Sequence, residues 1–222
     1  IIAGFYARAG IVYLNNGETG SVTFIGTVSP AGGNLKEPVT ESTKKAARCF
    51  YALSQNRADS KRYPAIDTLD SYSKYLEYPE FIDYSKEKLD ENWVGLVNEA
   101  RNVLVRGKET EEQINILGDD SVPIDYHVTL WKSEFVDFVI LQQDAFDKID
   151  ATTSLERQEY MLKKVINVTR SEFKFEGFEE VAIYFKRLIN VFRQMNYTVF
   201  KSEEFHKAEE EANAVLEERI IK

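Results

Sequence analysis

Residues 20–40 read GSVTFIGTVSPAGGNLKEPVT and decide the fold of this chain. The stretch begins as an apolar, β-branched run typical of a strand and continues into a loop rich in Pro, Gly and Asn. Pro38 closes this loop just before a helical pattern begins at Thr40. A strand, a glycine loop and a helix in this order are the layout of an α/β nucleotide-binding domain, in which ligands bind beyond the carboxyl ends of the strands.

The loop carries no phosphate-binding signature. Gly32 and Gly33 are compatible with a backbone nest for an anion, but a glycine pair more often turns the chain, and we favour the turn. No Gly-Lys-Thr follows, so this is not a phosphate-binding loop. We therefore expect the phosphate-binding part of such a domain to lie outside this sequence.

Composition limits the possible functions of the 222 residues. The net charge of −9 is unevenly divided, because residues 1–66 carry eight Lys or Arg against four Asp or Glu, whereas residues 67–222 carry 20 against 33. The acidic bulk argues against nucleic-acid binding, and the basic first part suits a small anion such as a nucleotide phosphate. No apolar run approaches the length of a membrane span, and the lone Cys49 predicts a reducing, cytoplasmic setting.

The first 66 residues contain both strand and helix patterns. Residues 5–8 resemble the last turn of a helix that stops at Gly10, and residues 11–14 and 22–28 are predicted strands joined through a hairpin turn at residues 15–17. A helix is expected from Thr40 through Leu53, and residues 62–66 break the pattern. Because the chain opens in the middle of a pattern, at Ile1, we expect it to be a piece of something longer.

Beyond residue 67 the strand signals vanish and amphipathic helices follow one another. They are expected near 91–106, 109–117, 124–142, 154–173, 177–195 and 202–220, with Ser154 as the cap of one of them. The predicted fold class is thus α+β and mainly α. Residues 1–66 would be the end of an α/β nucleotide-binding domain with short strands, and residues 67–222 an all-α helical bundle.

Few side chains suggest chemistry by themselves. The two histidines, His127 and His206, cannot build a His-rich metal site, and we expect them on helix surfaces or satisfied locally. Tyr63 and Phe146 could each stack on a flat ligand, although aromatic side chains are more often plain core residues. Residues 117–125 form an acidic turn that is either a solvated connector, with Asp residues capping the next helix, or a contact for a basic partner.

Several runs, ordered and well spaced between residues 5 and 154, resemble the catalytic A subunits of vacuolar- and archaeal-type rotary ATPases. The first 150 residues carry Phe5-Tyr6-Ala7-Arg8-Ala9-Gly10, the stretch 20–40, Cys49-Phe50-Tyr51-Ala52-Leu53, Arg62-Tyr63-Pro64-Ala65-Ile66, Ser71-Tyr72-Ser73-Lys74-Tyr75 and Leu141-Gln142-Gln143-Asp144-Ala145-Phe146-Asp147. The run from Ser29 to Thr40 is the most specific of these. The last 65 or so residues fit only as generic C-terminal helices.

The resemblance implies a C-terminal part of a V-type or A-type ATP synthase subunit. Such A subunits use ATP or ADP with Mg²⁺, alternate with B subunits in a hexameric ring and turn a central-stalk rotor. That ring is attached peripherally to the cytoplasmic face of a membrane sector that carries protons or sodium ions. In the family the Walker A loop and the catalytic glutamate precede the part seen here. We therefore expect no catalytic residues, no metal ligands and no bound nucleotide in this chain alone.

Two groups of site residues follow from the same resemblance. The adenine pocket is expected from Tyr63 and Pro64 together with Gln142, Gln143 and Phe146. Tyr63 and Tyr51 depart from the family, which commonly has Phe and Trp there. The rotor contact is expected from Asp119, Asp120, Ser121, Val122, Pro123 and Asp125.

The alternative is a non-catalytic helical protein-interaction module whose acidic helices bind a basic partner. The genomic sequence upstream of Ile1 would separate the two interpretations. A glycine-rich loop ending in Gly-Lys-Thr a couple of hundred residues earlier favours the ATPase, and an adjacent start codon favours the module.

Overall fold

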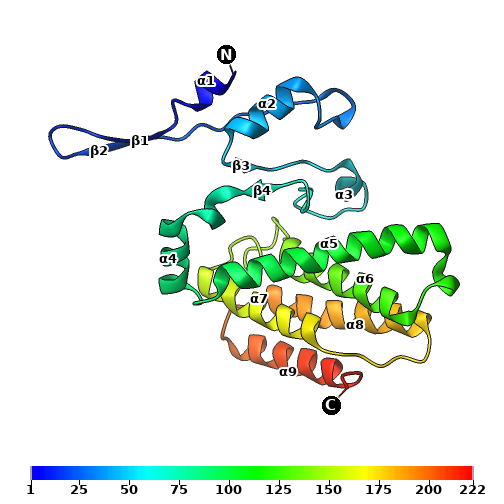
Figure 1. Ribbon diagram of the computed structural model, residues 1–222. Coiled ribbons are helices and arrows are strands. Elements are labelled where there is room, and N and C mark those ends of the chain that lie inside the picture. Colours follow the sequence, from blue (N-terminus) through cyan, green and yellow to red (C-terminus); the bar gives the residue numbers. More distant parts are fainter. Residues whose placement is uncertain (1, 222) are drawn as a thin grey trace.

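A computed structural model describes residues 2–221, which form a helical bundle below a smaller lobe of short helices and strands (Figure 1). The bundle consists of α5 Trp93–Leu117, α6 Ile124–Val136, a π-helical turn Asp137–Leu141, α7 Leu155–Arg170, α8 Phe178–Asn196 and α9 Glu203–Glu217. The mainly α class with a few short strands, predicted from the sequence, is confirmed.

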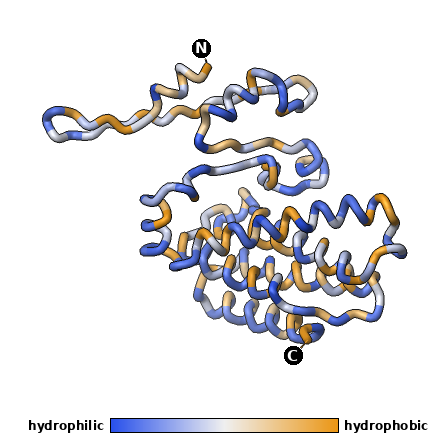
Figure 2. The backbone as a smooth tube through the Cα atoms, in the orientation of Figure 1, coloured by the Kyte–Doolittle hydropathy of each residue, from blue (hydrophilic) through white to orange (hydrophobic). Residues whose placement is uncertain are grey.

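One continuous apolar core holds the bundle together. In α8 the buried residues recur at helical spacing, from Val181 to Met195, so that one face of the helix is fully covered. Figure 2 shows the matching alternation of hydrophobic and hydrophilic residues along the helices. The largest fully buried side chains are Phe135, Phe185, Phe192, Phe205, Ile166, Leu188 and Met195.

Serine caps begin two of the bundle helices. The Oγ of Ser154 accepts a hydrogen bond from the amide of Arg157 at 3.3 Å, which confirms the predicted cap. The Oγ of Ser202 accepts one from the amide of Phe205 at 3.1 Å and begins α9 in the same way.

The sequence interpretation was wrong about α5, which is one helix of 25 residues instead of two. The predicted gap between residues 106 and 109 contains Gly107, which lies inside the helix. A Cβ at this position would collide with the Cβ and Oγ of Ser133 on α6. Gly107 therefore allows α5 and α6 to pack closely. The sequence pattern of α5 alone does not reveal this contact.

The elements that precede the bundle make up the upper lobe, apart from α4, which lies beside the bundle in Figure 1. They are α1 Ile2–Tyr6, β1 Gly10–Tyr13, β2 Thr19–Val22, a 3₁₀ turn Ala31–Gly33, α2 Pro38–Ala46, β3 Cys49–Phe50, α3 Gln55–Asp59, β4 Tyr72–Ser73, a second 3₁₀ turn Lys74–Glu77, and α4 Pro79–Lys88. Positive φ angles of 60° at Gly32 and 69° at Gly33 agree with their use in a turn.

The predicted hairpin is confirmed, with Tyr13 paired to Thr19 and Gly10 to Val22 in antiparallel register. The strand predicted for residues 22–28 was wrong, because β1 offers no partner beyond Gly10 and β2 ends at Val22. The helix predicted through Leu53 also stops early, at Ala46. Residues 49–50 instead pair with residues 72–73, a strand that lies in the region where none was predicted.

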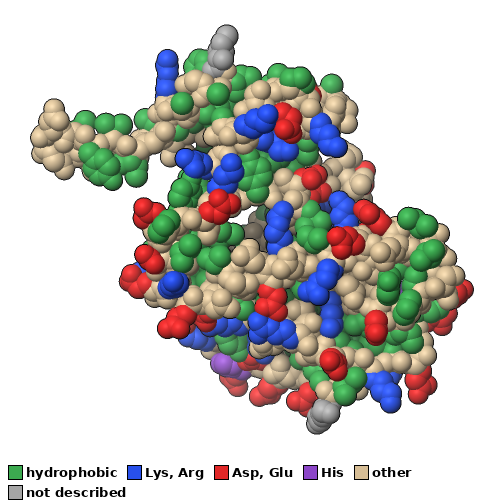
Figure 3. Space-filling model, viewed as in Figure 1, with side chains coloured by type: hydrophobic (Ala, Val, Ile, Leu, Met, Phe, Trp, Pro, Cys, Tyr) green, Lys and Arg blue, Asp and Glu red, His purple; other side chains and the backbone are tan. Residues whose placement is uncertain are grey.

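Charged side chains are scattered over both parts of the molecule in the view of Figure 3, among hydrophobic and neutral polar ones. Within residues 2–221, no helix combines the length and apolar character that crossing a bilayer requires.

Glu209 attaches α9 to α7. Its carboxylate accepts a hydrogen bond from the Tyr160 hydroxyl, forms an ion pair with Lys164 Nζ at 2.7 Å and lies 3.5 Å from Nδ1 of His206. Burial alone would raise the pKa of Glu209, but the hydrogen bonds from Lys164 and Tyr160 outweigh it and lower this pKa below its ordinary value. Burial and the same carboxylate raise the pKa of Tyr160 to about 12.

Phe185→Ala should reduce the free energy of unfolding of the 222-residue chain by about 3–5 kcal/mol, because a fully buried ring is lost and a cavity remains. Urea unfolding followed by circular dichroism measures the change. Ile183→Ala is the control on the same helix, since this side chain is 71% exposed and should change little. Equal effects of the two substitutions would contradict the packing described for α8.

Glu209→Gln should lower the urea midpoint at pH 7 by more than it does at acidic pH. The lowered pKa means that the carboxylate stabilises the fold above its ordinary pKa of 4.5, and that this stabilisation is lost as pH falls through the lower pKa of the folded chain. The difference between wild type and variant should therefore narrow as the pH falls below 4.5. The exposed neighbour Glu210→Gln is the control, and a difference that is independent of pH would contradict this account.

Candidate functional site

Two loops that lie about 80 residues apart in the sequence meet between the lobe and the bundle. One follows α3 and contains Tyr63 and Pro64, and the other follows the π-helical turn and contains Gln142, Gln143 and Phe146. The amide of Gln143 donates a hydrogen bond to the carbonyl of Tyr63 at 2.9 Å. The structure thus brings together the two segments that the resemblance assigned to one pocket.

The first loop is shaped by α3. Ser54 caps this short helix by accepting a hydrogen bond from the amide of Arg57, and the amide of Arg62 returns to the carbonyl of Arg57 at 2.8 Å. The chain then passes through Lys61, which has a positive φ, and the cis peptide between Tyr63 and Pro64. The Tyr63 side chain is 54% exposed, so its ring has a face open to solvent.

The second loop is held by two aspartates. Oδ1 of Asp147 accepts hydrogen bonds from the amides of Ile149 and Asp150, each at 2.8 Å. The buried Asp150 in turn accepts the amide of Asp144 on Oδ2 and the Nε2 donor of Gln143 on its carbonyl, each at 2.6 Å. Burial raises the pKa of Asp150. These bonds fix the loop without using Phe146.

Phe146 lies in an exposed turn. The sequence placed it at the end of a helix, but the helical backbone already ends at Leu141. Its side chain is 98% exposed, the highest exposure among the large hydrophobic residues of the described chain. An aromatic ring so exposed on an ordered loop is available to stack on a flat ligand.

A cavity of about 960 Å³ lies beside the meeting point of the two loops. Residues from the segment 51–77, from α5 and α7 and from the end of α6 line it. Pro64, Gln142 and Gln143 are among the lining residues, whereas Tyr63 and Phe146 are not. The predicted adenine residues are therefore split between the wall of this cavity and the outer surface of the loops.

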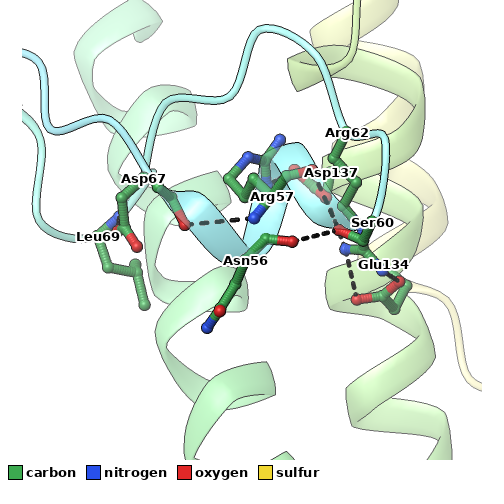
Figure 4. Close-up of polar contacts among 9 residues, drawn as sticks. Asn56, Arg57, Ser60, Arg62, Asp67, Leu69, Glu134 and Asp137 are labelled. Atoms are coloured by element: carbon green, nitrogen blue, oxygen red, sulfur yellow. Dashed lines mark hydrogen bonds and ion pairs between the residues drawn. The ribbon is translucent and has the colours of Figure 1, made fainter.

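Four charged side chains link the two parts of the chain, as Figure 4 shows. Asp137 accepts hydrogen bonds from Nη1 of Arg57 on Oδ1 and from Nη1 of Arg62 on Oδ2, both at 2.8 Å. Arg62 also binds Glu134 with Nη1 at 3.0 Å and Nη2 at 2.6 Å. We call Arg57, Arg62, Glu134 and Asp137 the ion cluster. It contains two positive and two negative charges and is balanced.

Within the ion cluster, the surroundings of Arg62 favour its charged form. Burial alone would lower the pKa of Arg62, but the hydrogen bonds and charges of Glu134 and Asp137 outweigh it and raise this pKa. The guanidinium also lies over the ring of Phe138, 4.7 Å from its centroid. The ion cluster was not predicted from the sequence. The available signal was a pair of acidic residues, Glu134 and Asp137, within the apolar stretch where α6 passes into the π-helical turn.

The predicted rotor contact lies at the other end of α6. Asp119, Asp120 and Ser121 form an exposed 3₁₀ turn, Val122 is half-buried, and Pro123 leads into the helix. Asp125 lies in the first turn of α6, where its charge suits the helix dipole. The expectation that an Asp caps this helix was wrong, because the cap position is Pro123 and no side chain caps there.

Both histidines have contacts with nearby residues that account for their positions. His127 is buried, approaches the carbonyl of Asp119 with Nε2 at 3.1 Å and stacks on Phe178, so it does not lie on the surface. His206 is exposed next to Glu209. Within residues 2–221, no group of three or more His, Cys, Asp or Glu side chains is arranged to hold a metal ion.

Comparison with known proteins identifies the family. Residues 1–73 match the nucleotide-binding domain of the ATP synthase alpha/beta family, and residues 82–176 match the C-terminal domain of V and A type ATP synthase. The chain therefore belongs to the ATP synthase alpha/beta family, in its V and A type branch.

Curated relatives carry the same family name. The chain is 43% identical over 212 residues to the V-type ATP synthase alpha chain of Borrelia duttonii (strain Ly), an alignment that covers 94% of this chain and 34% of the relative. It is 40% identical over 209 residues to that of Treponema denticola, with 94% and 33% covered. The chain thus spans about a third of the length of the curated relatives it matches.

One solved structure supports the fold. The ATP synthase subunit NeqB from Nanoarcheaum equitans superposes with a TM-score of 0.54 at 22% identity, over 77% of this chain and 39% of the other. At this identity the likeness concerns the fold alone.

Proposed function

We propose that this chain acts as the C-terminal part of the catalytic alpha (A) subunit of a V/A-type ATP synthase. The observation that carries the proposal is an identity of 43% to a V-type ATP synthase alpha chain along 94% of this sequence. In the whole subunit, residues 1–66 would complete the nucleotide-binding domain and residues 67–222 would form the helical domain. The alternative of a separate interaction module has no comparable support.

In this proposal the complete enzyme couples hydrolysis or synthesis of ATP with Mg²⁺ to the movement of protons or sodium ions. The subunit alternates with B subunits in a hexameric ring around a central-stalk rotor, on the cytoplasmic face of a membrane sector. The acidic turn, with Asp119, Asp120, Ser121, Val122, Pro123 and Asp125, is the proposed rotor contact. Its exposure and negative charge suit a basic partner surface.

The proposed adenine subsite consists of Tyr63, Pro64, Gln142, Gln143 and Phe146. The hydrogen bond between the amide of Gln143 and the carbonyl of Tyr63 supports this assignment, because it holds the two segments together without a ligand. The exposed rings of Tyr63 and Phe146 supply apolar faces for a base.

The 222-residue chain by itself should release no phosphate from Mg-ATP. Its sequence contains no Gly-x-x-x-x-Gly-Lys-Ser/Thr loop to hold the phosphates, and phosphoryl transfer depends on such positioning. A phosphate-release assay measures this, with the assembled ATPase as the positive control. Sustained turnover by the chain alone would contradict the division of roles proposed here.

Phe146→Ala in the complete subunit should weaken Mg-ATP binding by about 5- to 150-fold, since stacking of one base contributes about 1–3 kcal/mol. The thermal unfolding of the subunit should not change, because the ring is exposed. Lys148→Ala is the matched control from the same loop. An unchanged dissociation constant for Mg-ATP, measured by calorimetry, would remove Phe146 from the subsite.

A further inference from the structure

One buried residue holds both loops of the candidate site. The side chain of Asp137 binds Arg57 and Arg62, and Arg62 directly precedes Tyr63. The backbone carbonyl of Asp137 accepts the amide of Gln142 at 2.9 Å, which closes the π-helical turn. The side chain of this residue therefore positions the first loop, and its backbone positions the second.

The burial and charge of Asp137 make this arrangement rigid. The residue is only 4% exposed, and each of its two carboxylate oxygens has a guanidinium donor. A buried carboxylate that loses a charged partner is strongly destabilised, so neither arginine can leave alone. The Nη1 atom of Arg62 is shared between Asp137 and Glu134, which also fixes the direction of this side chain.

We propose that Asp137 is a positioning residue for the nucleotide site. Through Arg57 and Arg62 it sets the place of Tyr63 and Pro64 relative to the segment from Gln142 to Phe146, and thereby the gap into which a base fits. The proposal rests on the adenine subsite proposed above. Asp137 itself is not expected to touch the nucleotide.

The position of Asp137 also gives a reason for the buried ion cluster, which stability alone does not require. An ion cluster buried at a contact between two parts of a chain contributes little net stability compared with apolar residues of the same volume. What it supplies is a defined geometry, because bidentate and shared hydrogen bonds tolerate little displacement. The π-helical turn, a form of backbone found frequently at functional sites, begins at the same residue.

The test compares two ligands that share the triphosphate and differ in whether adenosine, with its base and ribose, is attached. In the complete subunit, Asp137→Asn should raise the dissociation constant of Mg-ATP about tenfold or more, because misplaced binding groups lose most of their contribution. The dissociation constant of Mg-tripolyphosphate, which has no base, should not change. A purely structural role would weaken both ligands together.

Two further variants keep the test decisive if Asp137→Asn does not fold. Arg62→Lys preserves the charge but cannot bind Glu134 and Asp137 in the same fork, so Mg-ATP should weaken severalfold while Mg-tripolyphosphate stays constant. Glu99→Gln is the matched control. It breaks the ion pair of Glu99 with Arg170 at 2.6 Å, which joins α5 to α7 away from the ion cluster, and it should leave both constants unchanged.

The outcomes are distinct. Weaker Mg-ATP binding with unchanged Mg-tripolyphosphate binding, in every cluster variant that folds but not in Glu99→Gln, supports the role of Asp137. Unchanged Mg-ATP binding in a folded Arg62→Lys subunit, or a parallel loss of both ligands, overturns it while the proposed function stands. If the wild-type subunit binds Mg-tripolyphosphate but not Mg-ATP, the adenine subsite fails, and this inference fails with it.

Discussion

The sharing of one buried carboxylate by two arginines is the contact on which the arrangement of the two parts depends. Among the described residues before α4, only Thr40, Thr43 and Ala52 are buried, so the upper lobe has little core of its own to orient it. The extensive apolar core belongs to the bundle. A directional contact therefore has to supply the orientation that packing does not, and hydrogen-bonded charges are more directional than apolar contacts.

The same contact changes the meaning of the uneven charge distribution. The excess of basic residues in the first 66 positions suggested attraction to a phosphate. Two of these residues, Arg57 and Arg62, instead form ion pairs with Glu134 of α6 and Asp137 of the π-helical turn. In a third contact the arginine comes from the bundle. Arg101 of α5 donates hydrogen bonds to the carbonyls of Thr68, Leu69 and Ser71, which precede the bundle. Part of the charge difference thus holds the lobe and the bundle together.

The sequence predicted those features that depend on neighbouring residues. The hairpin at residues 15–17, the Ser154 cap and the strong periodicity of α8 were all recognised, because turn chemistry and helical spacing are local. The errors concern distant partners. The strand at Cys49 exists because residues 72–73 pair with it, and the glycine inside α5 lies where Ser133 of another helix leaves no room for a Cβ. The ion cluster joins residues more than 70 positions apart, and no local pattern specifies such a pairing.

The contact at Gly107 has a mechanical consequence. At this point no side chain of α5 separates its backbone from α6, so the pair has no compressible layer between the two helices. Two helices packed this closely resist bending more than either would alone, and we expect them to move as one rigid pair. A displacement at the acidic turn that connects them would therefore rotate the whole helix pair, with little bending of either helix.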